Sequence, residues 1–100
     1  MNSLLDKILD WAYARNLIGG STPQAQMLKL MEEMGELASG IAKNKRGVQA
    51  DSIGDCLVVL TIIAEQLDLD LEVCLAMAYD EIKDRKGQMR DGVFVKEEDL

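Results

Sequence analysis

Two acidic segments carry the residues of this chain that are best suited to chemistry. They are Glu32-Glu33-Met34-Gly35-Glu36 and, about twenty residues later, Asp51-Ser52-Ile53-Gly54-Asp55. Carboxylate oxygens without His or Cys beside them suit Mg²⁺ or Mn²⁺, and Mg²⁺ commonly joins a few carboxylates to substrate phosphates. Such an ion neutralises phosphate charge and orients water, which a spare carboxylate can deprotonate. Lys83 and Arg85 could meet the remaining phosphate charge.

The first acidic segment lies in a helix predicted from 23 to about 43. Thr22 can cap this helix, and Pro23 at its first position loses no hydrogen bond. Its apolar residues recur at spacings of three and four, and they are Met27, Leu30, Met31, Met34, Leu37, Ala38 and Ile41. Glu33 and Glu36 are expected about 100° and about 160° from the centre of that stripe.

Two interpretations of these glutamates follow. One is a solvated acidic face, as most helices have. The other is a helix packed on a second side, where the carboxylates converge. Gly35 and Gly40 favour the second interpretation slightly, because a glycine inside a helix usually marks a close approach.

The second acidic segment lies in a predicted helix from about 48 to 67 that is apolar nearly all round. One hundred residues can hardly surround such a helix in one subunit, so we expect another subunit to cover it. Asp55 is expected on the side of Val59 and Ile62, where an acid is costly to bury unless it has a partner such as a cation. Asp51, one turn earlier, could share that site.

Two further helices are predicted, from about 3 to 16 with Ser3 as N-cap and from about 70 to 86 with Asp70 as N-cap. The single proline and eight glycines leave little material for an all-β fold. We therefore expect one all-α domain over 1–100, with a core at about 3–87 and a C-terminal arm at 88–100. The expected assembly is a homo-oligomeric bundle of helices.

The composition and charge of the chain limit which partners and which cellular location we expect. The net charge of −7 disfavours binding to nucleic acid. The N-terminus lacks the pattern of a signal peptide, and the longest apolar run, Cys56 to Ala64, is too short to span a bilayer. Cys56 and Cys74 are expected to be reduced core residues of a cytoplasmic protein.

The order and spacing of three segments resemble a known family. Glu32–Ala38 and Ile53–Leu60 resemble the EExxE…ExxD signature of MazG-like all-α nucleoside triphosphate pyrophosphohydrolases, and Ala78–Gly87 resembles the ending of small, phage-type members. The resemblance extends from about 24 to 95. It implies Mg²⁺-dependent cleavage of a nucleoside triphosphate to the monophosphate and pyrophosphate, in nucleotide-pool housecleaning, with Mn²⁺ as a second candidate ion. It also implies a homo-oligomer, either a dimer or a tetramer built as a pair of dimers.

The resemblance also assigns roles to residues. Glu33 and Glu36 match metal ligands of the first half of the signature, and Asp55 matches the final acid. Glu32 matches a supporting or second-metal position. Three residues near the end match positions that contact phosphate or neighbour those that do: Lys83, Arg85 and, where many relatives have Asn, Asp80.

The chain departs from the signature at Ser52, which replaces the first acid of ExxD. Asp51 is the candidate replacement; without it the site has three strong ligands. This departure motivates a second hypothesis, a non-catalytic oligomerisation or regulatory module with a degenerate site. A third hypothesis is a pyrophosphatase acting on a phosphoribosyl nucleotide. No base-binding pocket can be assigned from the few aromatic residues, Trp11, Tyr13, Tyr79 and Phe94.

Overall fold

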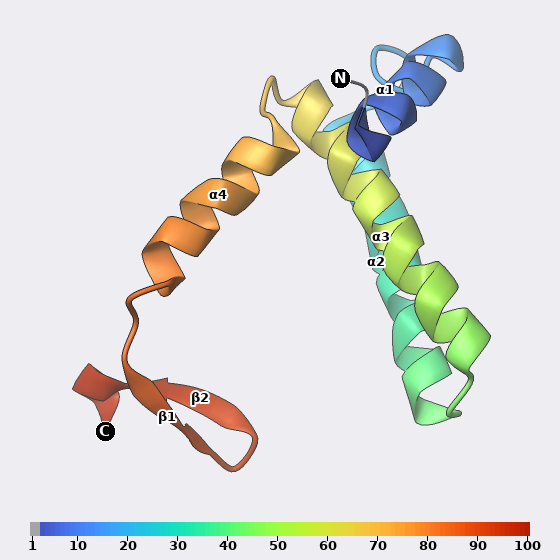
Figure 1. Ribbon diagram of the computed structural model, residues 1–100. Coiled ribbons are helices and arrows are strands. Elements are labelled where there is room, and N and C mark those ends of the chain that lie inside the picture. Colours follow the sequence, from blue (N-terminus) through green and yellow to red (C-terminus); the bar gives the residue numbers. More distant parts are fainter. Residues whose placement is uncertain (1–2) are drawn as a thin grey trace.

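A computed structural model describes residues 3–100, which form four helices followed by a β-hairpin (Figure 1). The elements are α1 (Leu4–Ala14), α2 (Pro23–Ala42), α3 (Arg46–Gln66), α4 (Leu71–Ile82), β1 (Gly87–Arg90), β2 (Val93–Lys96) and the 3₁₀ helix η1 (Glu97–Asp99). The predicted helical class and its four helices are confirmed. The hairpin in the C-terminal arm was not predicted, and residues 1–2 of the predicted domain lie outside the described part.

Short polar side chains set where three of the helices begin. Ser3 and Asp6 form a reciprocal capping box at α1. Thr22 accepts a hydrogen bond at the start of α2, and Asp70 does so at the start of α4. These N-caps were predicted from the sequence and are confirmed. The first three helices are each followed closely by a residue in the left-handed region, which Asn and Asp tolerate: Asn16, Asn44 and Asp68.

An antiparallel pair of helices, α2 and α3, forms the centre of the structure (Figure 1). The buried positions of α2 are Leu30, Glu33 and Gly40, with Leu37 half-buried between them. Their spacing of three and four places them on one face of the helix. Glu33 therefore belongs to the packed face of α2. The buried residues of α3 are Ser52, Val59, Thr61, Ile62 and Ala64.

This packing divides the apolar stripe predicted for α2. Leu30 is buried and Leu37 is half-buried, but the other large members stay between 46% and 62% exposed: Met27, Met31, Met34 and Ile41. The packed face is rotated toward Glu33, because Gly40 allows close contact with the start of α3. A methyl group at Gly40 would lie 2.8 Å from Cγ1 of Val48. The structure supports the interpretation in which the carboxylate side of α2 is packed, but within one chain this side takes the place of most of the apolar stripe and does not add a second contact to it.

The first helix is fastened to α3 by polar contacts as well as by packing. The Tyr13 hydroxyl donates a hydrogen bond of 2.6 Å to Oε2 of Glu65. The side-chain amide of Gln66 donates to the carbonyl oxygens of Leu17 and Ile18, in the connection that follows α1. These contacts fix α1 across one end of the helix pair.

The fourth helix behaves differently, since it leaves the helix pair at the turn after α3 and extends away from it (Figure 1). No residue of α4, Leu71–Ile82, is buried. The helix ends at Ile82, before the predicted end near Lys86, and the β-hairpin lies beyond it. The two-residue turn Asp91-Gly92 has positive φ at both residues, as a tight hairpin turn requires. Within one chain, the four helices do not close into a bundle.

The third helix is the one element of residues 3–100 that is long and apolar enough, by length and composition, to cross a membrane. The run Cys56 to Ala64 alone is not. A core helix of a soluble protein meets the same criteria, and α3 packs on both α2 and α1. The expectation of no membrane partner stays a prediction.

Alanine substitutions at Gly35 and Gly40, the two glycines of α2, test whether Gly40 is needed for the close contact between α2 and α3. Gly40→Ala should lower the free energy of unfolding by about 1–3 kcal/mol, because its methyl group would press on the stiff Val48 side chain. Gly35→Ala is the matched control: its methyl group meets nothing within 4 Å, so it should raise that free energy by about 0.5–1 kcal/mol. Urea unfolding measures both. Equal responses would contradict the close approach at Gly40.

Candidate metal centre

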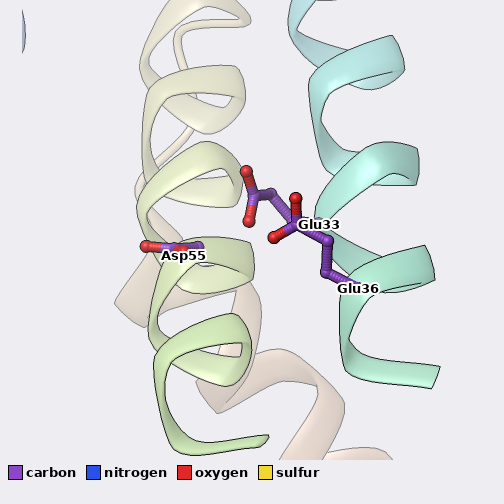
Figure 2. Close-up of side chains that lie close together, drawn as sticks. All are labelled: Glu33, Glu36 and Asp55. Carbon is purple, nitrogen blue, oxygen red and sulfur yellow. The ribbon is translucent and has the colours of Figure 1, made fainter. Parts of the chain in front are cut away.

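Three carboxylates converge where α2 and α3 pack. Glu33, Glu36 and Asp55 each offer an oxygen, and these three oxygens lie within 4.8 Å of one another. Glu33 and Glu36, three residues apart on α2, extend toward α3, which carries Asp55 (Figure 2). Glu33 is buried, Asp55 is half-buried and Glu36 is exposed, so the cluster leads from the helix interface to the surface. The three acids singled out in the sequence are thus brought together.

The carboxylate of Glu33 has one oxygen paired and one unpaired. Its Oε1 atom lies 3.2 Å from Nζ of Lys29, one turn earlier on α2. Its Oε2 atom is buried and has no hydrogen-bond partner among the described residues. A buried carboxylate oxygen without a partner is costly. An oxygen-seeking cation would satisfy it, so the donor set and its geometry fit Mg²⁺ or Mn²⁺.

The electrostatics of the cluster also favour a bound cation. The pKa of the Asp55 carboxyl is raised by partial burial, then by the negative charges of Asp51 and Glu33, and Lys29 only partly opposes this. The pKa of Lys29 is itself raised, mainly by its hydrogen bond to Glu33. One exposed lysine therefore faces several carboxylates. A divalent cation would offset the remaining repulsion.

Glu32, predicted as a supporting or second-metal residue, lies outside this group of three. Its side chain is largely exposed, and its Oε2 atom lies 3.8 Å from Nζ of Lys29. Lys29 thus contacts both neighbouring glutamates. No role was predicted for Lys29, although its position four residues before Glu33 on one helix is a recognisable ion-pair spacing.

The two candidates for the fourth acid position are not part of the cluster among the described residues. Ser52 is buried, with only 2% of its surface exposed. Asp51 is exposed and lies one turn before Asp55. Both aspartates line an apolar pocket between α1 and α3. The side chain that could replace the missing acid thus faces a different part of the surface around Asp55.

The residues predicted to contact phosphate lie at the far end of α4. Nζ of Lys83 is 3.2 Å from Oδ1 of Asp80, and a guanidinium nitrogen of Arg85 is 3.8 Å from a carboxylate oxygen of Glu81. Since α4 extends away from α2 and α3, these residues are not brought to the acidic cluster within one chain (Figure 1).

Comparisons with known proteins agree with the geometry. A family model described as "MazG nucleotide pyrophosphohydrolase domain" matches residues 21–91, which include all three clustered acids. An uncharacterised 18.2 kDa protein from the rep-hol intergenic region of Haemophilus phage HP1 (strain HP1c1) is 56% identical over 70 residues. That match covers 70% of this chain and 43% of the relative, so this chain spans less than half of that protein. No solved structure matches.

Cation binding should be visible as a gain in stability. Mg²⁺ or Mn²⁺ at about ten times its Kd should add about 1.4 kcal/mol to the free energy of unfolding and raise Tm by several degrees. Asp55→Asn should abolish this gain. Without a divalent cation the variant should be at least as stable as the wild type, because it removes a repulsion.

Thermal unfolding with and without the cation measures both effects. Asp10→Asn, an exposed acid on α1 outside the cluster, is the control and should respond to the cation as the wild type does. An unchanged response in Asp55→Asn would rule out the cluster as the binding site.

Proposed function

The chain belongs to the MazG nucleotide pyrophosphohydrolase domain family, and on that premise we propose that it is a Mg²⁺-dependent enzyme that hydrolyses nucleoside triphosphates to the monophosphate and pyrophosphate. The observation that carries this proposal is the partnerless oxygen of Glu33 within a cluster of three carboxylates. Mn²⁺ is the alternative ion. The proposed role is the removal of unwanted nucleotides from a cytoplasmic pool.

Each acidic residue of the site has a role in the proposed reaction. Glu33, Glu36 and Asp55 would supply the oxygens that hold the cation. A bound Mg²⁺ neutralises phosphate charge and lowers the pKa of water. Lys29 pairs with Oε1 of Glu33 and leaves the buried Oε2 atom without a hydrogen-bond partner. The exposed Glu32 is the candidate to accept a proton from the attacking water or to support a second ion.

We further propose a homo-oligomer in which a second copy completes the site. Large apolar side chains on one side of α4 are exposed, among them Leu75, Tyr79 and Ile82, and apolar exposure on this scale is typical of an interface. Lys83 and Arg85 directly follow this helix, which extends away from α2 and α3 (Figure 1), so they lie beyond reach of the cluster in their own chain. Docking of α4 on another copy would bury its apolar side. It would also bring the cationic side chains of Lys83 and Arg85 toward the phosphates of a substrate bound to that copy. Asp80, paired with Lys83, would orient that lysine.

One observation favours the alternative, a non-catalytic oligomerisation or regulatory module. Ser52 stands where the signature has an acid, and Asp51 lies outside the cluster, so the site has one strong ligand fewer than the signature. Metal binding without any turnover would support this alternative. Analysis of the products would also distinguish a triphosphate substrate from a phosphoribosyl nucleotide.

The central test is release of pyrophosphate from canonical and modified nucleoside triphosphates with Mg²⁺. The wild type should turn over at least one of them, and Glu36→Gln should lose about 100-fold or more in kcat/KM, because it removes a cation ligand. Asp10→Asn serves as the charge-matched control. Folded wild-type protein that cleaves none of the panel, or full activity in Glu36→Gln, would refute the enzyme.

Mixing two inactive variants tests the shared site. Glu36→Gln disables the cluster, and Arg85→Ala disables the residue proposed to come from the other copy. If each site draws on two chains, one of the two sites in a mixed dimer carries both wild-type residues, so co-refolded variants should regain activity that neither has alone. Absence of recovery in proteins that form mixed oligomers by mass spectrometry would place both residues in one chain.

A further inference from the structure

Lys29 brings a positive charge to the acidic cluster, one turn before Glu33 on α2. Its Nζ atom lies 3.2 Å from Oε1 of Glu33 and 3.8 Å from Oε2 of the exposed Glu32. The ammonium group therefore occupies one of the two oxygens of a buried carboxylate. The other oxygen of Glu33, Oε2, is buried and has no hydrogen-bond partner among the described residues.

The stability of α2 is a poor explanation of the pair between Lys29 and Glu33. A pair of opposite charges four residues apart adds little to a helix, and it adds less when Lys precedes Glu, as it does here. Glu33 is also buried, at a position where an apolar side chain would pack without the cost of desolvating a charge. The effect of Lys29 on the oxygens of Glu33 is the better explanation.

The pair makes the two oxygens of Glu33 unequal as ligands of a cation. A cation that bound both oxygens would have to displace the ammonium group from Oε1, whereas a cation that bound only Oε2 would leave the pair in place. The ions differ in this respect. Mg²⁺ is small, requires octahedral geometry and keeps several waters, so a single oxygen from each carboxylate suffices. Ca²⁺ takes about six to eight oxygens and commonly binds a carboxylate through both of its oxygens.

We propose that Lys29 is a positioning residue that determines which cation the cluster binds. By holding Oε1 of Glu33 it restricts that carboxylate to one ligand oxygen, which favours Mg²⁺ or Mn²⁺ over the larger Ca²⁺. The inference rests on the proposed function, since it takes Glu33, Glu36 and Asp55 as the ligands. It adds to that function the residue that selects the ion. Lys29 acts through Glu33 and does not itself bind the cation.

A direct contact with a substrate phosphate is the competing role for Lys29, because its side chain is exposed beside the cluster. The position of the ammonium group favours the role through Glu33, since it lies between two glutamates and within hydrogen-bond distance of the buried one. A contact with phosphate acts only when a nucleotide is bound, whereas selection of the ion does not need one. Cation binding in the absence of nucleotide therefore separates the two roles.

Three variants test the proposal. Lys29→Met removes the ammonium group and keeps an unbranched side chain of high helix propensity, so it should stay folded. Lys29→Arg retains a cationic donor for Oε1. Lys7→Met is the matched control, because it removes the same charge from an exposed position within α1. Calorimetry without nucleotide measures the Kd of Mg²⁺ and of Ca²⁺ for each protein. If Lys29→Met needs a cation to fold, the gain in Tm with each ion gives the same comparison.

The readout is the ratio of the Ca²⁺ Kd to the Mg²⁺ Kd, because a change of charge alone alters the affinity for both divalent ions in the same direction. In Lys29→Met this ratio should fall by about tenfold or more. Lys29→Arg and Lys7→Met should keep the wild-type ratio. An unchanged ratio in Lys29→Met, including an equal change in both affinities, would overturn the proposal, as would wild-type protein that binds neither ion.

These measurements are independent of turnover, so the proposal and the proposed function can fail separately. A cation preference that depends on Lys29, in a protein that cleaves no nucleoside triphosphate, would refute the enzyme and support the role of Lys29. Release of pyrophosphate by a protein whose cation preference is the same with and without Lys29 would support the enzyme and refute that role.

Discussion

The burial of the Glu33 carboxylate in the interface of α2 and α3 is the constraint on which this structure depends. The side chain lies on the packed face of α2, between Leu30 and Leu37, where a hydrophobic residue would contribute more to stability. A buried charge without a full set of partners costs several kcal/mol. Lys29 pairs with one oxygen, and the other is buried without a hydrogen-bond partner, in a carboxylate that belongs to the group of three acids. The helix interface thus gives up stability at the point where a cation would restore it.

Contacts at the two ends of the helix pair fix the position of the Glu33 carboxylate relative to Asp55. Gly40 and the start of α3 set the distance between the helices at one end, and the contacts of Gln66 and Tyr13 fix α1 at the other. Glu33 and Asp55 lie between these two anchored ends. Carboxylates held on two packed helices keep their spacing better than carboxylates on loops do, and preorganisation of this kind makes a cation site selective for small, hard ions.

Much of the architecture was accessible from the sequence because local signals carried it. Capping residues gave the helix starts, and the position of Asp55 on an apolar side of α3 indicated that the acids converge. The rotation of α2 was not accessible: the methionine-rich side has the greater apolar content, yet Gly40 brings the other side into contact. Hydrophobic periodicity identifies the most apolar face of a helix from the residues of that helix alone. It does not show which face a neighbouring helix can approach most closely.

Other features depended on information that lies beyond a single chain or a local pattern. The direction of α4 could not be predicted, since its apolar side has the same spacing whether the helix packs in its own chain or on another. Asp51 could be placed near Asp55, but its assignment to the cluster or to the adjoining pocket needed the position of α1. Ser52 was recognised as a departure from the signature, and its burial became evident only from the helix packing.

The extension of α4 also has a consequence for how this protein forms. The connections among the first three helices are short, and their contacts can be made by one molecule at a rate independent of concentration. Because α4 buries no residue against its own chain, any burial of its apolar side on a second molecule is a bimolecular event, faster when the protein is abundant. In that case the concentration of the protein in the cell, and not only its sequence, would determine how soon α4 packs against a second molecule.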